Sequence, residues 1–236
     1  TPRCHALLLN SPWNPTGTVL TRDELAAIAD FCERRNVTII SDEIYEAIVY
    51  EGHQHISPAT IARNRTVVVN ALSKTYAMTG WRVGYCAGPK PLIDAMFMVL
   101  AQSSRGPATF IQDAAAVALS SSQECTAQMR EIYAQRKAQV SKALAGVPKV
   151  KVLEPEGGFF SMADVREMNI PSDEVRIRLL NDHGVCGAHG AAYGKMGEGT
   201  LRVSFASGGE TLAKGLTRLS DGLDRKSTRL NSSHVA

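Results

Sequence analysis

A run of uncharged, mainly β-branched residues, Thr66–Asn70, is the feature that most constrains the fold of this 236-residue chain. Such a run is typical of a strand that is covered on both faces of a sheet. Small and polar residues follow it, so we expect Lys74 on a short loop just beyond the carboxyl end of a core strand. Ligands of open α/β sheets bind at that edge. A lysine near apolar residues can act as a nucleophilic amine that forms a Schiff base, so Lys74 is the first candidate functional residue.

The residues after Lys74 add a second functional group, the guanidinium of Arg82, whose fork suits a phosphate or a carboxylate. Together these residues read SKTYAMTGWRVG (Ser73–Gly84). The segment resembles the lysine segment of class I and II aminotransferases, which are pyridoxal-phosphate enzymes of fold type I. The resemblance implies that Lys74 holds pyridoxal 5'-phosphate as a Schiff base and that Arg82 binds its phosphate. Ala71 departs from the family, which usually has Ser or Gly there, with the serine hydroxyl on the phosphate.

The turn Asn14–Gly17 carries a second part of the resemblance. Taken alone, Asn-Pro-Thr-Gly is only an irregular turn that its prolines and glycine impose. It resembles the family's NPTG loop, whose asparagine donates to the phenolic oxygen of the cofactor and helps to hold the substrate carboxylate. The resemblance carries both roles to Asn14.

Asp42 follows the predicted strand Val37–Ile40, in the motif Asp-Glu-x-Tyr. A lone aspartate after a strand is usually a helix cap, but its occurrence with Asn14 and Lys74 favours a cofactor role. The motif resembles the family's, in which the aspartate pairs with the pyridinium and the tyrosine, here Tyr45, bonds the phenolic oxygen. A carboxylate near the pyridine nitrogen keeps that nitrogen protonated and makes the ring an electron sink.

The predicted last strand, Thr200–Ala206, contains Arg202. It resembles the family's final strand, whose arginine grips the α-carboxylate of the substrate. A bidentate pair of this kind orients the Cα–H bond for proton removal. His189-Gly190 departs from the Pro-Gly that family members often have. The resemblance covers about Ala6–Asp224.

Hydrophobic periodicity and turn residues predict the remaining elements. A capping box at Thr21 and Glu24 begins a helix that ends near Arg35. We expect Met96 and Met98 to serve packing within their helix. The other predicted helices are Pro91–Gln102, Pro107–Ser120, Glu124–Ala145, Glu174–His183 and Glu210–Leu223, and the other strands are Ala6–Leu9, Val83–Ala87, Val150–Leu153 and Gly158–Ala163.

The resemblance implies an α/β fold with two domains, to which these elements are assigned. Residues 1–122 form part of a fold-type-I large domain, with a mostly parallel sheet and helices on both faces. Residues 123–224 form a bridging helix and a small α+β domain. Residues 225–236 have the composition of a non-native tail, and we exclude them from the fold.

Composition and charge exclude several other classes of protein. No apolar run approaches the about 18 residues of a membrane span. The net charge of +3 comes from three basic residues in the tail, so nucleic acid is not an expected partner. Five widely spaced cysteines without a CxxC motif predict free thiols in a reducing cytoplasm. No metal is expected, because His183, Cys186 and His189 fit no common zinc motif. His53 and His55 lie in a polar stretch, and we expect them to be solvated.

The resemblance implies amino transfer from an amino acid to a 2-oxo acid, by a homodimer when the protein is complete. Two alternatives stay open: elimination or decarboxylation on the same fold, and an aminotransferase-like effector domain of a transcription regulator. Family members also carry an upstream phosphate-binding turn and a ring-stacking aromatic that this sequence lacks. We therefore expect the interior of a longer protein, and we expect residues 1–236 alone to be inactive.

Overall fold

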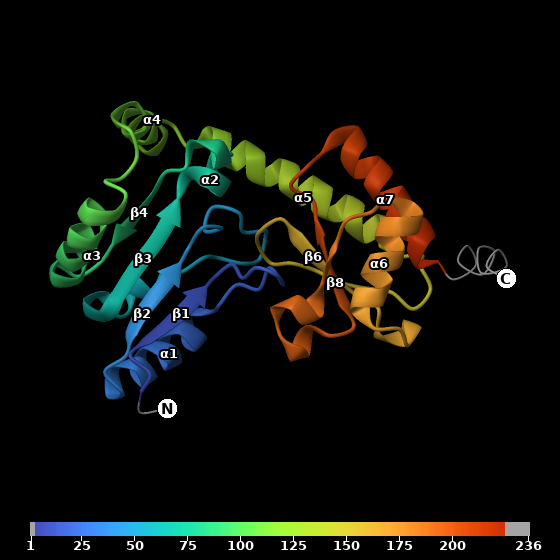
Figure 1. Cartoon of the computed structure of the whole chain (residues 1–236), viewed down its shortest axis with the longest axis horizontal. Coiled ribbons are helices and arrows are strands. Elements are labelled where there is room, and N and C mark those ends of the chain that lie inside the picture. The colour runs from blue at the N-terminus through green and yellow to red at the C-terminus, as the bar shows by residue number, and fades with distance from the viewer. Residues whose placement is uncertain (1–2, 225–236) are drawn as a thin grey trace. The chain divides into compact units, whose positions relative to one another are not determined.

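Helices and strands group into two units in the computed structural model, which describes residues 3–224 (Figure 1). The first unit contains the residues up to Trp13 and Thr18–Arg130, and the second contains Asn14–Gly17 and the residues from Glu131 onward. The division falls inside helix α5 (Glu124–Leu144), whereas the predicted domain boundary precedes that helix. The predicted tail, 225–236, lies outside the described residues. No helix in the described range is long and apolar enough to cross a membrane.

A four-stranded sheet of order β1-β2-β3-β4 forms the centre of the first unit (Figure 1). The first three strands run parallel and β4 runs antiparallel to β3, so the sheet is mostly parallel as predicted. Asn10, Asp42 and Val69 share one register level, because Asn10 pairs with Asp42 and Asp42 with Val69. The strands are β1 (Ala6–Asn10), β2 (Thr38–Asp42), β3 (Thr66–Ala71) and β4 (Gly84–Ala87).

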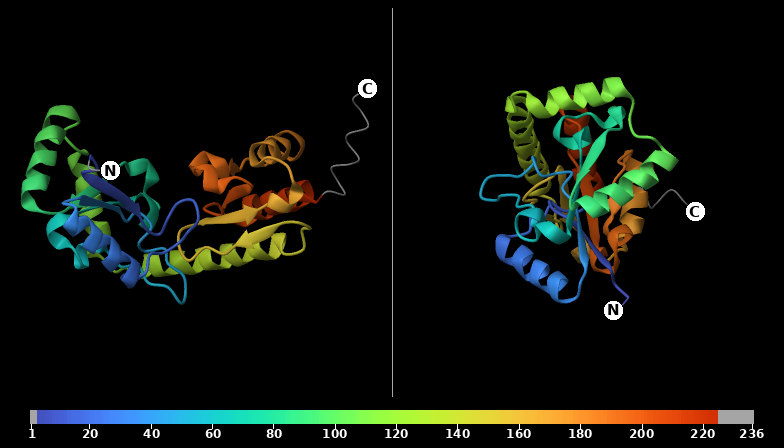
Figure 2. Two further views of the ribbon diagram at one scale, coloured as in Figure 1. Left: turned by 90° about the horizontal axis from the view of Figure 1, so that it is seen from below. Right: turned by 90° about the vertical axis from the view of Figure 1, so that its left-hand side faces the viewer.

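Helix α1 (Arg22–Arg34) begins with the predicted capping box. The Glu24 N–H donates to Thr21 Oγ1 (3.3 Å), and the Thr21 N–H donates to the Glu24 carboxylate (2.8 Å). The helix covers one face of the sheet, where Cys32 packs with Ile39 and with Leu7 and Leu9 of β1 (Figure 2). Burial of this apolar stripe is what holds α1 on the sheet.

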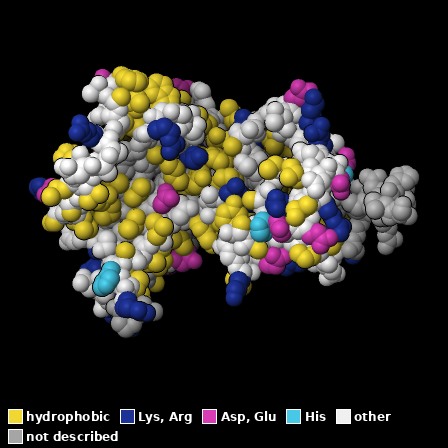
Figure 3. Space-filling model, in the orientation of Figure 1, with side chains coloured by type: hydrophobic (Ala, Val, Ile, Leu, Met, Phe, Trp, Pro, Cys, Tyr) yellow, Lys and Arg dark blue, Asp and Glu magenta, His cyan; other side chains and the backbone are white. Residues whose placement is uncertain are grey.

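Helices α3 (Lys90–Ser103) and α4 (Thr109–Ser120) have the predicted bounds to within two residues. Few of their side chains are buried by other elements. No side chain of α3 is buried, and Ala115 is the one buried residue of α4. The prediction that Met96 and Met98 serve packing is wrong for this chain, because both are exposed, Met98 to 71 %. Figure 3 shows hydrophobic side chains gathered over this part of the unit.

The second unit is built on an antiparallel sheet of order β5-β6-β8-β7. Helix α6 (Ser172–His183) packs against α7 (Gly209–Leu223). Gly222 permits this close approach, since a Cβ there would lie 2.6 Å from Leu179 Cδ2. Four buried leucines line α7: Leu212, Leu216, Leu219 and Leu223. The strands are β5 (Lys151–Leu153), β6 (Phe160–Asp164), β7 (Ala188–His189) and β8 (Thr200–Ser204).

Some of the short elements have no predictive sequence pattern. Strand β7 lies in the glycine-rich stretch and was not predicted. Neither were the short 3₁₀ helices, which span Pro58–Thr60, Arg63–Arg65, Thr79–Trp81, Arg166–Met168, Gly190–Tyr193 and Lys195–Gly197.

Candidate active site

Lys74 lies directly beyond the carboxyl end of β3, where the sequence predicts it. It sits in a one-turn helix, α2 (Leu72–Thr75), rather than in the expected loop (Figure 1). Leu72 anchors this turn in a small core with Val83 and Ala115. Lys74 as a residue is half-buried at this edge of the sheet.

Asp42 is the last residue of β2, the strand that neighbours β3. Its Oδ1 accepts the N–H of Ile44 (3.2 Å), and its backbone carbonyl accepts Asn10 Nδ2 (3.0 Å). Burial raises the pKa of Asp42, the Ile44 N–H lowers it, and the charge of Glu43 raises it again, with a net increase. The carboxyl group is therefore fixed in place at an edge where its negative charge is only partly stabilised by the protein.

Tyr45 and Glu43 occupy the turn that follows Asp42, and both are buried. Sequence analysis gave Glu43 no role, yet its carboxylate accepts hydrogen bonds from Ser41 Oγ (2.9 Å) and Ser57 Oγ (2.6 Å). His55 Nε2 lies 3.1 Å from its other oxygen. The expectation that His55 is solvated is wrong, because its side chain is only 11 % exposed; the loop folds back and buries it against Glu43. His53 is exposed, as expected.

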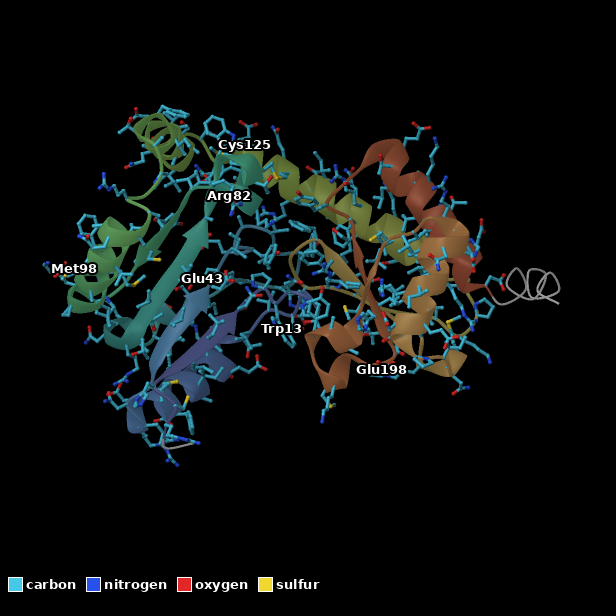
Figure 4. The ribbon with its side chains drawn as sticks, viewed as in Figure 1. Trp13, Glu43, Arg82, Met98, Cys125 and Glu198 are labelled. Carbon is cyan, nitrogen blue, oxygen red and sulfur yellow. The ribbon has the colours of Figure 1, made fainter. Side chains whose placement is uncertain are left out.

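Arg82 precedes β4 and has a left-handed backbone conformation with φ of 53°. This region is uncommon for residues other than glycine and recurs at functional sites. Nη1 of Arg82 donates to the carbonyl of Thr79 (3.1 Å). The side chain lines an open groove of about 1220 Å³, which Ala71 and Tyr85 also line. Figure 4 shows Arg82 near α2.

Asn14 and Arg202 meet within the second unit. Arg202 Nη1 donates to Asn14 Oδ1 (2.7 Å). The guanidinium carbon also lies 4.4 Å from the ring centre of Phe160 and 5.2 Å from that of Tyr193, an arrangement that favours a cation–π interaction. Arg202 Nε is buried without a hydrogen-bond partner among the described residues. A buried donor of this kind is costly unless an acceptor reaches it.

Asn14 belongs to the second unit because its turn is tied to residues 155–157. The carbonyl of Gly17 accepts the N–H groups of Glu156 (3.1 Å) and Gly157 (2.8 Å). Gly17 has a φ of +76°, and a Cβ there would lie 2.4 Å from Pro155 Cβ. Only glycine fits this position, so the turn Asn14–Gly17 is a structural part of the second unit.

The structure thus places the candidate residues in two groups. Asp42, Tyr45, Lys74 and Arg82 lie in the first unit, at or near the ends of neighbouring strands, and Asn14 and Arg202 hydrogen-bond to each other in the second. The aromatic side chains of Phe160 and Tyr193 were missed. Phe160 pairs with Ser204, two residues beyond Arg202 on the neighbouring antiparallel strand, and the sequence does not reveal that pairing.

The mostly parallel sheet, the lysine after β3 and the antiparallel second sheet define an α/β protein of fold type I. The chain belongs to the family "Aminotransferase class I and II", whose family model matches residues 1–219. Enzymes of this family generally depend on pyridoxal phosphate.

Similar proteins of known name support the assignment to this family. The chain is 38 % identical, over 221 residues, to the arginine–pyruvate transaminase of Pseudomonas aeruginosa, and covers 56 % of that protein and 93 % of its own length. It is 38 % identical to aromatic-amino-acid aminotransferase 2 of Thermococcus litoralis, of which it covers 59 %. The crystal structure of an aromatic aminotransferase from Pyrococcus horikoshii superposes with a TM-score of 0.91 at 37 % identity, over 98 % of this chain and 62 % of that one. The chain therefore spans somewhat more than half the length of these relatives.

Proposed function

We propose that the protein containing this chain is a pyridoxal-phosphate-dependent aminotransferase that moves an amino group from an amino acid to a 2-oxo acid. It works as a cytoplasmic homodimer. The observation that carries the proposal is the position of Lys74, one turn beyond β3 and beside the strand that ends in Asp42. The relatives described above are named transaminases or aminotransferases, which favours amino transfer over elimination, decarboxylation or a regulatory role.

The donor set suits the cofactor on chemical grounds. Asp42 offers a half-buried carboxylate for the pyridine nitrogen, and Tyr45 and Asn14 offer groups for the phenolic oxygen. Arg82 offers a guanidinium for the phosphate, from a left-handed backbone conformation with φ of 53°. Lys74 supplies the amine that holds the aldehyde carbon.

When bound, pyridoxal phosphate supplies an electron sink for the charge that proton removal leaves on Cα. Arg202 binds the α-carboxylate of the substrate, and its buried Nε, which lacks a partner among the described residues, is the donor that a carboxylate oxygen would satisfy. Asn14 holds Nη1 and so fixes the plane of the guanidinium. With the cofactor and substrate bound, the free amine of Lys74 would act first as the general base that takes the proton from Cα and then as the general acid that delivers it to C4′ of the cofactor.

Residues 1–236 alone should bind the cofactor weakly and should not transaminate. Ala71 offers no hydroxyl for the phosphate, so Arg82 is the one anchor among the candidate residues. The groove that Arg82 lines is open, and the exposed side chains of α3 border it. A phosphate held by a single guanidinium facing solvent gains little binding free energy, because water competes for both groups.

Borohydride trapping tests the assignment of Lys74. The full-length protein that contains this chain is incubated with pyridoxal phosphate, reduced with borohydride, digested and mapped by mass spectrometry. We expect the pyridoxyl group on Lys74 and its loss in Lys74→Arg, whereas Lys90→Arg, a change at an exposed lysine, leaves the labelling of Lys74 intact. A label that falls mainly on another lysine would end the proposal.

A further inference from the structure

The carboxylate of Glu43 is the most deeply buried charged group near the candidate site. Its side chain is only 3 % exposed, and Figure 4 shows it just beyond the end of β2. Ser41, Ser57 and His55 surround its two oxygens, at 2.9, 2.6 and 3.1 Å. Burying a carboxylate costs free energy that its hydrogen bonds only partly offset, so an apolar residue would hold this turn more cheaply. Stability alone therefore does not explain why a carboxylate occupies this position.

The backbone groups of Glu43 form hydrogen bonds that hold the segment between Asp42 and Tyr45, two candidate cofactor-binding residues. Its N–H donates to the carbonyl of Val69 (3.0 Å), which extends the pairing with β3 one residue beyond β2. Its carbonyl accepts the N–H of Glu46 (2.9 Å), which closes the turn that contains Tyr45. The N–H of Ile44, held within this turn, donates to Asp42 Oδ1. The direction of the Asp42 carboxyl group thus depends on where the peptide after Glu43 points.

We propose that Glu43 is a positioning residue, which fixes the turn Asp42–Tyr45 by tying it to residues 55–57. Successive side chains of a strand point to opposite faces, so Ser41 and Glu43 act from the face opposite Asp42. Glu43 thereby orients the Asp42 carboxyl group without occupying the space beside it. The identity of the ligand that Asp42 binds rests on the proposed function. The positioning of the Asp42 carboxyl group by Glu43 does not depend on it.

The neighbouring charges are consistent with an ionised Glu43. Burial alone would raise the pKa of Glu43, but hydrogen bonds from His55, Ser57 and Ser41 and the charge of His55 outweigh it, so the pKa is lowered. Glu46 also faces this cluster; burial first, and then the charge of Glu43, raise its pKa. Glu43, Glu46 and His55 are close enough to share a metal ion. Both oxygens of Glu43 are already engaged by side-chain neighbours, so hydrogen bonds suffice to hold the cluster together.

Removing the charge of Glu43 while keeping its size is the first test, on the cofactor-free 236-residue chain. In Glu43→Gln, we expect the Ile44 amide to exchange at least tenfold faster. We also expect the pKa of Asp42, followed by the ¹³C shift of its carboxyl carbon, to fall, because a neighbouring negative charge that raises it is gone. Glu51→Gln, the same change at an exposed residue of the same stretch, should alter neither quantity.

A local effect separates positioning from general destabilisation. Positioning predicts faster exchange at Ile44 and Glu46 with unchanged exchange at Ile39 and Ile40 inside β2, whereas a structural role alone accelerates all four together. If Glu43→Gln does not fold, Ser57→Ala and His55→Leu each remove one donor and should give the same local pattern. Unchanged exchange of Ile44 and an unchanged Asp42 titration in the folded variants would overturn the inference.

A second measurement separates this inference from the proposed function. Borohydride trapping of pyridoxal phosphate on Lys74 is compared in Asp42→Asn, Glu43→Gln and the double variant. If Glu43 acts through Asp42, the double variant traps no less cofactor than Asp42→Asn alone. Absence of trapping on Lys74 in the unaltered protein would count against the proposed function and leave the amide-exchange result standing, whereas losses that multiply in the double variant would count against positioning.

Discussion

The helices of the two units differ in how much of their apolar surface they bury. In the second unit, α7 places four leucines in the core and packs against α6 across Gly222. In the first unit, α3 buries no side chain. Strand β4, which lines the same open groove as α3, is exposed along its whole length. Both units have ordinary sheets with regular registers, so the difference lies in the cover of the helices rather than in the strands.

This difference shows that helix formation and helix burial are separate requirements. The sequence of α3 is rich in good helix formers, and it ends at Ser103 without buried anchors. Isolated helices of this length are marginal in water, because tertiary packing supplies most of their stability. A contiguous exposed apolar face also marks an interaction surface in a native protein and an association hazard in an isolated one.

Amide hydrogen exchange should give the largest contrast. We expect the amides of α3 to exchange on the order of 10³-fold or more faster, after correction for intrinsic rates, than the central amides of α7. Local opening of an uncovered helix costs little, whereas opening α7 exposes four leucines. Comparable protection in the two helices would remove the distinction between the units.

A matched pair of leucine substitutions tests the same contrast through packing. Leu216→Ala on α7, where the side chain is 6 % exposed, should lower the free energy of opening measured by exchange in the second unit by about 2–5 kcal/mol. Leu119→Ala on α4, where the leucine is 48 % exposed, should change the corresponding value in the first unit by about 0.5 kcal/mol or less. Equal losses at the two sites would mean that α4 is packed in solution.

Association of the chain should depend on the face of α3. We expect Met98→Lys to weaken self-association about tenfold in sedimentation or light scattering, because it places a charge in an apolar patch. Lys142→Ala, a loss of charge on the part of α5 that belongs to the second unit, serves as the comparison and should not reduce association. Association that persists unchanged in Met98→Lys would assign the interaction to another surface.

The features that could be predicted from the sequence are those encoded by residues close together in the chain. The capping box at Thr21 and Glu24 was predicted and is confirmed, and the bounds of the helices follow hydrophobic periodicity closely. The position of Lys74 beyond β3 also followed from a local pattern, although the residue lies in a helical turn. The expected packing of Met96 failed because composition predicts apolar residues to be buried, whereas burial depends on what covers the helix.

The rest of the candidate site depends on contacts between residues that are distant in sequence. Asn14 belongs to the second unit because Gly17 meets Pro155, and no local pattern encodes that contact. His55 looked solvated among polar neighbours, yet its loop returns to Glu43. The residue types at the ends of the strands could be predicted from the sequence, whereas their hydrogen-bond partners required the fold.

The smallest expected effect concerns α1, the helix of the first unit that is covered. Thr21→Ala removes the hydroxyl that accepts the Glu24 N–H, and losing a cap of this kind costs about 1 kcal/mol. We therefore expect the amides of the first turn of α1 to exchange about fivefold faster, while Cys32 at the buried end keeps its protection.

Thr217→Ala on α7 is the matched control. Its hydroxyl donates to the Ala213 carbonyl inside the helix, and alanine is the better helix former, so protection there should stay the same or rise slightly. If Thr21→Ala unprotected the whole of α1, the capping box rather than the buried stripe would be holding this helix, and the first unit would lack a well-anchored helix of the kind that α7 gives the second.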